Sequence, residues 1–165
     1  MKLFFVSLFT FIILIINIVY SQEEIVFQNA NLKIQIPNEW SVNKISNKYL
    51  IYSNKKDLFI GVNEVNEKRI NVVFDNVMKT LNSTFKNAVY EPPVNYNVNG
   101  LHLVLLTGKN IDGQFINYAL VSSPNGKTLE FGSVIRPDAF SKYKDILIYM
   151  ANEIIKINGN SKGQV

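Results

Sequence analysis

The segment VNYNVNGLHLVLLTGK, residues 94–109, decides the fold that the sequence predicts. Val94, Tyr96 and Val98 alternate with asparagines, which is the period-two pattern of a strand with one buried face. Asn99-Gly100 comes next, and both residue types tolerate the positive φ angles of a type I′ turn. The apolar residues that follow this turn complete a β-hairpin.

The second strand of the hairpin is apolar on both faces. Within residues 101–106, every residue except His102 is apolar. A strand of this kind is normally covered on both sides. We therefore expect it in the middle of a sheet, with Leu103 and Leu105 buried on one face and Val104 on the other.

Other short apolar segments, bounded by turn residues, predict further strands around the hairpin. Pro37 ends one of them because proline cannot donate to a sheet ladder. Asp112-Gly113 and Pro124-Asn125-Gly126 provide tight turns that join the later strands into an antiparallel meander. These predicted strands are residues 25–27, 32–36, 49–53, 58–65, 114–122 and 127–135.

Two segments follow the helical spacing of three and four residues instead. The first covers residues 71–87, with Asn71 as a suitable N-cap. The second covers residues 140–154, with Gly159 as a C-terminal stop. Strands and helices in this order predict one α+β domain. The apolar residues of the first helix are Phe74, Val77, Met78, Leu81, Phe85 and Ala88, and those of the second are Phe140, Tyr143, Ile146, Leu147, Met150 and Ile154.

The first 21 residues have the layout of a secretory signal peptide. Lys2 precedes an almost wholly apolar segment, residues 3–20, and Val19 and Ser21 are suitable for a signal-peptidase cut. An uncleaved membrane anchor stays open as the alternative, because the segment reaches the lower limit of length for crossing a bilayer. Both interpretations place the rest of the chain beyond the membrane, as an exported protein that is periplasmic or secreted.

The remaining chain has the size of one domain, residues 22–159, followed by a frayed polar tail at residues 160–165. No cysteine is present, which excludes a disulfide framework and a lipid-bearing cysteine. The net charge of +4 becomes +3 (4 − 1) when the leader and its one lysine are removed. Charge of this size, without long basic runs, does not favour nucleic acid, and we expect membrane contact only through a retained leader.

Residues that carry chemistry do not form a catalytic or metal-binding pattern. His102 is the only histidine, and no correctly spaced partners for a serine triad or a zinc site accompany it. No Gly-rich loop joins a strand to a helix in the way that phosphate cradles do. We therefore predict no catalytic residue, no cofactor and no metal ion.

The order of the elements resembles the PsbP-like superfamily. The resemblance rests on IQIPNEW at residues 34–40, on a helix before the strand-NG-strand hairpin, on SPNGKT at residues 123–128 and on a closing helix. It covers about residues 25–157. It implies an α/β/α sandwich with a central, mainly antiparallel sheet of about six to seven strands, one helix mid-chain and one C-terminal helix. It also implies roles in binding or assembly, and none of the superfamily's functional residues can be matched to a position here.

Function is accordingly predicted as non-catalytic binding or assembly assistance, with a protein partner in the envelope or extracellular space. The alternative is a carrier that holds a small apolar ligand between sheet and helix, among residues such as Phe74, Phe85 and Phe131. An enclosed apolar pocket of about 300 Å³ or more would favour the carrier.

Two exposed turns are the predicted contact surfaces. Both combine rigid prolines with an aromatic or charged side chain, which gives a preordered contact at low entropic cost. The alternative interpretation is that both turns only end helices and strands. The candidate binding residues are Tyr90, Glu91 and Pro93 in the connection before the hairpin, and Arg136 and Asp138 at the corner before the last helix.

Overall fold

The structure is a computed structural model that describes residues 23–157. The predicted leader at residues 1–21, the tail at residues 160–165 and Gly159 lie outside the described residues. The strands are β1 (Glu24–Phe27), β2 (Leu32–Gln35), β3 (Ser41–Ile45), β4 (Lys48–Tyr52), β5 (Phe59–Val65), β6 (Val89–Tyr90), β7 (Val94–Val98), β8 (Leu101–Lys109), β9 (Phe115–Ser122), β10 (Thr128–Ile135) and β11 (Ile154–Lys156). The helical segments are α2 (Ile70–Thr84), the 3₁₀ turn η1 (Pro137–Ala139), α3 (Phe140–Tyr143) and α4 (Ile146–Asn152).

The main sheet is antiparallel throughout and has eight strands, in the order β3-β4-β5-β10-β9-β8-β6, with β7 also paired to β8. The strands β6 and β7 follow each other along the same side of β8. Glu91, Pro92 and Pro93 separate them, and prolines cannot donate to a ladder. The sheet is therefore larger than the six to seven strands expected.

The predicted hairpin is present as β7 and β8. Val98 pairs with Leu101, and Asn99 and Gly100 between them have φ angles of 52° and 70°, as a type I′ turn requires. The expected central position of β8 is wrong, because β10 lies in the middle and β8 is next to the edge. Near this edge the cover becomes thinner, so Val104 and Leu105 are only half-buried, while Leu103 is fully buried.

A second, three-stranded sheet has the order β1-β2-β11. Its last strand corrects the prediction of one continuous helix over residues 140–154. The helix ends at Asn152, and Ile154 then pairs with Ile34 of β2. β-Branched residues favour a strand, and the Asn99 side-chain amide donates to the carbonyls of Asn152 and Ile154, at 2.9 and 3.0 Å.

Helix α2 begins at Ile70, and Arg69 occupies its N-cap position without a side-chain hydrogen bond. The prediction of Asn71 as N-cap is therefore wrong. The buried face of the helix is Val73, Val77 and Leu81. The predicted apolar stripe is correct in direction, but Val73, which was missed, lies at its centre, and Phe74 and Met78 lie at its margins.

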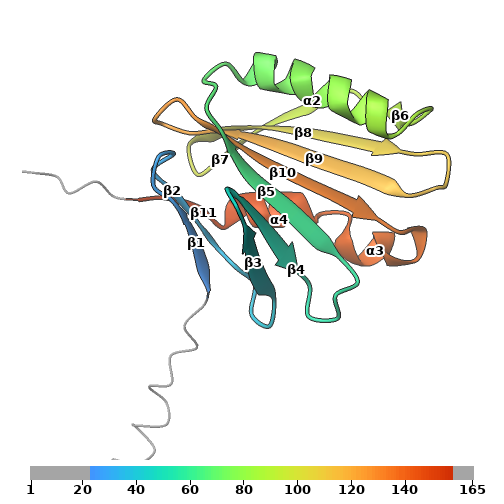
Figure 1. Cartoon of the computed structure of the whole chain (residues 1–165), viewed down its shortest axis with the longest axis horizontal. Helices are drawn as coiled ribbons and strands as arrows, with labels where there is room; N and C mark the ends of the chain where they lie inside the picture. Colours follow the sequence, from blue (N-terminus) through green and yellow to red (C-terminus); the bar gives the residue numbers. More distant parts are fainter. Residues whose placement is uncertain (1–22, 158–165) are drawn as a thin grey trace, which may run out of the picture.

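The domain has three layers (Figure 1). On one face of the main sheet, α2 packs against Leu106, Ile116 and Leu120. On the other face, the small sheet and the short C-terminal helices pack over residues such as Leu103 and Phe131. The expected α+β sandwich is thus confirmed, with an outer layer that mixes short helices and strands. Among residues 23–157, no helix is long and apolar enough to cross a membrane.

Candidate functional site

An open groove of about 560 Å³ lies between the β6–β7 edge of the main sheet and the helices α3 and α4. We call it the edge groove. The sheet supplies its floor, and the two short helices supply one wall. Its lining includes Val89, Glu91, Val94, Tyr96, Leu105, Thr107, Phe115, Asn117, Phe140 and Ile148.

The edge strands give this groove an exposed apolar border. Val94 and Tyr96 pair with Leu105 and Leu103, so their side chains lie on the face of the sheet that the C-terminal helices cover. The helices leave them partly uncovered: Val89, Val94 and Tyr96 are 75%, 48% and 37% exposed. The alternating apolar residues of β7 therefore form a partly exposed apolar surface along the groove.

A polar row crosses the groove floor and extends beneath the covering layer. Thr107, Asn117 and Ser133 are partners in register on β8, β9 and β10. The Thr107 hydroxyl donates to the Glu91 carboxylate at 2.8 Å. Asn117 is only 3% exposed, and its Nδ2 atom has no hydrogen-bond acceptor among the described residues. An unpaired buried donor is costly, so Asn117 weakens the packing beneath the groove.

One end of the groove is closed by stacked rings. The centroids of Phe115 and Phe140 are 3.6 Å apart and their planes differ by 18°. The ammonium group of Lys109 lies 5.1 Å from the Phe115 ring centroid. This end therefore combines a rigid aromatic surface with a positive charge.

The residues predicted before the hairpin divide between two faces. Glu91 lines the groove, and Pro93 is exposed beside it. Tyr90 instead lies with the apolar cluster under α2, where its ring covers Gly108 and its buried hydroxyl has no hydrogen-bond partner among residues 23–157. Burial raises the pKa of this hydroxyl. Tyr90 is thus not an exposed contact residue in this structure.

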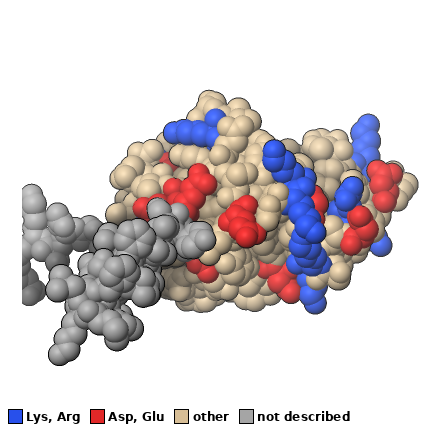
Figure 2. Space-filling view, turned by 90° about the horizontal axis from the view of Figure 1, so that it is seen from below, with Lys and Arg blue, Asp and Glu red and all other residues tan. Residues whose placement is uncertain are grey.

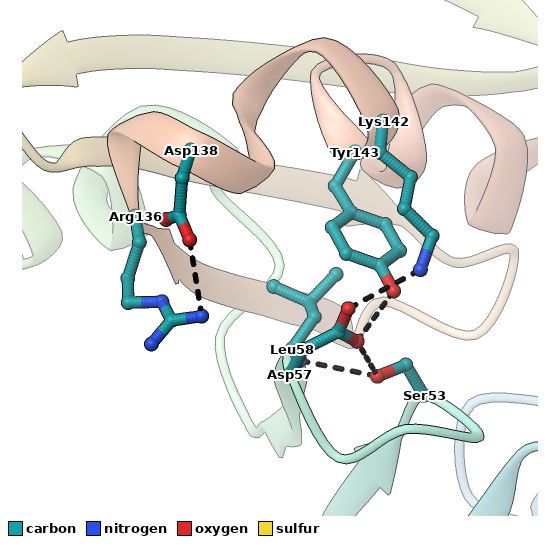
Figure 3. Close-up of polar contacts among 7 residues, drawn as sticks. All are labelled: Ser53, Asp57, Leu58, Arg136, Asp138, Lys142 and Tyr143. Carbon is teal, nitrogen blue, oxygen red and sulfur yellow. Dashed lines mark hydrogen bonds and ion pairs between the residues drawn. The ribbon is translucent and has the colours of Figure 1, made fainter.

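The corner before η1 places Arg136 and Asp138 together. Both are exposed and form an ion pair at 3.3 Å (Figure 3). No hydrogen bond or ion pair in the described part of the chain connects this corner to Glu91 or Pro93. Of these predicted residues only Glu91 lines the edge groove, and Arg136 and Asp138 do not.

A polar cluster that the sequence reasoning missed lies close to this corner (Figure 3). The hydroxyls of Ser53 and Tyr143 both donate to Asp57 Oδ1 at 2.5 Å, and Lys142 pairs with Oδ2 at 3.2 Å. The Ser53 and Tyr143 hydroxyls hold the pKa of Asp57 well below its usual range. So weak a base does not activate Ser53 as a nucleophile. The cluster instead fastens the β4–β5 turn to α3.

Within residues 23–157, no three side chains of histidine, cysteine, aspartate or glutamate converge to hold a metal ion. His102 is exposed, with Nε2 at 3.0 Å from the side-chain oxygen of Asn95. On the face shown in Figure 2, acidic and basic side chains are interspersed. The basic side chains include one narrow column across this face, with acidic side chains on both sides of it.

Comparison with known proteins identifies the fold. No protein-family model matches the sequence, and no curated protein matches it. The solution structure of cyanobacterial PsbP (CyanoP) from Synechocystis matches with a TM-score of 0.64 at 13% identity, over 84% of this chain and 94% of that chain. The Ran-binding protein Mog1p of Saccharomyces cerevisiae matches with a TM-score of 0.55 at 8% identity, over 84% and 96%.

A third solved structure is similar as well. LpqN of Mycobacterium tuberculosis, described as involved in cell envelope biogenesis, gives a TM-score of 0.51 at 11% identity, over 81% of this chain and 84% of that chain. The class defined by these matches is a three-layer α+β sandwich. This chain has the PsbP-like fold, as the sequence resemblance predicted. Identities this low leave its site and its partner to be argued from its own residues.

Proposed function

We propose that the protein is an exported, non-catalytic binding module that holds a segment of a protein partner in the edge groove. The observation that carries the proposal is the grouping of exposed apolar side chains along this groove. Val89, Val94 and Tyr96 come from two consecutive edge strands and border one depression. Exposed apolar residues are usually scattered, and a contiguous group of them marks an interaction surface.

The groove floor indicates the chemistry of the partner segment. Apolar side chains of the segment would cover Val94, Tyr96 and Leu105. The stacked pair Phe115–Phe140 supplies a rigid aromatic anchor, which is typical of the energetic centre of an interface.

The geometry of the β6–β7 edge favours an extended segment. Among the described strands β7 pairs only with β8, so its outer backbone edge is unpaired. Pro92 and Pro93 interrupt this edge, which limits strand addition to the short length of β7. A partner can thus add backbone hydrogen bonds to the side-chain contacts without opening the whole sheet to aggregation.

The similar proteins support binding in place of catalysis. Mog1p is a Ran-binding protein, and LpqN is involved in cell envelope biogenesis. The predicted leader at residues 1–21 supports an envelope or extracellular location for this chain. The alternative of a carrier for a small apolar ligand cannot use Phe74, Phe85 and Phe131 together, because Phe131 lies on the opposite face of the sheet from the other two.

A partner-capture experiment with a matched control tests the proposal. Val94→Asp places a charge in the groove, and Ile111→Asp places the same charge at a residue that is 76% exposed and outside the groove. Partners captured by the wild-type protein from its own cells should be lost with Val94→Asp and retained with Ile111→Asp. Both variants should melt like the wild type. Equal capture by both variants would exclude the groove as the binding surface.

A further inference from the structure

A second concave site lies on the other face of the main sheet, beside α2. Its volume is about 270 Å³, and we call it the helix-side pocket. The strands β4, β9 and β10 and the helix α2 contribute to it. Its lining residues are Lys48, Asn76, Val77, Thr80, Leu81, Tyr118 and Glu130.

The register of the sheet explains why this pocket exists. Two glycines, Gly61 and Gly132, are direct partners in the row beside Glu130. The Tyr118 ring lies across Gly132, where an added Cβ would come within 2.9 Å of the ring. The ring can therefore lie flat on the sheet, which leaves a space between α2 and β4 that no side chain of the described residues fills.

Glu130 lies in this space, and Lys48, the cation in the lining, forms no ion pair with it. Its Oε2 atom accepts long hydrogen bonds from the Tyr118 hydroxyl at 3.3 Å and from Asn63 Nδ2 at 3.4 Å. Burial raises the pKa of Glu130, and the bonds from Asn63 and Tyr118 and the charge of Lys48 oppose this only in part. No lysine or arginine of the described residues forms an ion pair with Glu130. Glu130 is half-buried, and a carboxylate held there with such weak compensation can gain from a cation supplied from outside.

The other groups of the pocket favour a ligand that has a hydrogen-bond donor at one end and an apolar chain attached to it. The Thr80 hydroxyl donates its proton to the backbone oxygen of Asn76, which leaves its own oxygen free to accept. Val77, Leu81 and the Tyr118 ring form an apolar wall. The volume is below the range for drug-sized ligands and suits a single short chain.

We propose that the helix-side pocket binds an organic cation, a primary ammonium group on a short alkyl stem, with Glu130 as its counter-ion. The ammonium group donates to the free oxygen of Glu130 and to Thr80, and the stem packs against Val77 and Leu81. Lys48 at the rim competes for the same carboxylate. A free alkylamine and the lysine side chain of another protein both carry this group.

Titration of the full-length protein with butylammonium, followed by NMR, tests the site directly. The probe should shift signals of Thr80 and Tyr118, whereas butanol, which has a similar shape and no charge, should not. Glu130→Gln should weaken binding about tenfold or more, because a bond to a charged group is lost. Lys48→Ala should tighten binding a few fold in low salt. Asp112→Asn, which removes an exposed charge in the β8–β9 turn, should bind like the wild type.

Nα-acetyl-lysine methylamide distinguishes the two sources of the cation. If both probes bind, a free alkylamine is sufficient as the ligand. If only the lysine amide binds, the ligand is a lysine side chain of another protein. The proposal is overturned if neither probe binds, if butanol binds as well as butylammonium, or if Glu130→Gln leaves binding unchanged. The Val94→Asp variant should bind butylammonium like the wild type, so this experiment tests the helix-side pocket independently of the edge groove.

Discussion

Replacing Leu103 with alanine tests the packing beneath the hairpin. Leu103 is 1% exposed, and its side chain lies in the apolar cluster between the main sheet and the C-terminal layer. The change removes three buried carbon atoms, which costs about 2 kcal/mol in transfer free energy at about 0.8 kcal/mol each. The cavity left by the missing atoms adds to this cost, because the strands on both sides of β8 prevent the surrounding side chains from closing it. We expect a loss of about 3 kcal/mol or more in the free energy of unfolding, within the range for such substitutions.

Leu105→Ala is the matched control. Leu105 lies two residues further along the same face of β8, but it is half-buried and borders the edge groove. Water fills the space that the change leaves, so we expect a loss of only about 1 kcal/mol. Urea denaturation measures both variants, and the midpoint should shift while the slope stays constant. A loss below about 0.5 kcal/mol for Leu103→Ala, or equal losses for both, would refute this packing.

Three further substitutions give distinct outcomes. Glu130→Gln should be more stable than the wild type near pH 7. Burial raises the folded pKa of this carboxyl, so the wild type loses stability as the pH rises through that pKa. The difference in the free energy of unfolding between variant and wild type, measured by urea denaturation, should therefore vanish near pH 4. Asp57→Asn should be less stable at neutral pH, and the difference should shrink in acid, because the folded pKa of Asp57 is lowered and protonation removes the same contacts. Gly108→Ala should cost about 1–3 kcal/mol by urea denaturation, because its Cβ would lie 2.4 Å from a ring carbon of Tyr90.

Much of the fold follows from local patterns. Asn99-Gly100 between alternating strands predicts the hairpin because the turn requires two residues that tolerate positive φ. The spacing of Val77 and Leu81 predicts the helix on its correct face. The strand β3 was missed because Ser41–Ile45 carries polar residues and is exposed on an edge. The strand β11 was missed because Ile154 also fits a helical stripe, and only pairing with β2 decides between the two.

The sites depend on contacts that no local pattern contains. Asp57 and Tyr143 are 86 residues apart in the chain, so nothing near either residue predicts their hydrogen bond. Tyr90 and Glu91 are adjacent, yet they lie on opposite faces because a strand alternates its side chains. The alternation of Val94 and Tyr96 predicted one apolar face. Whether that face is covered depends on where α3 and α4 end, which only the tertiary structure shows.

The most direct test of the binding proposal is site-specific photocrosslinking in the native host. A photoreactive amino acid would replace Tyr96 in the edge groove in one strain and Ile111 outside it in another. Illumination should join the protein to one distinct partner from position 96 and to none from position 111. No crosslink from position 96, or the same products from both positions, would contradict the proposal that the groove holds a protein partner.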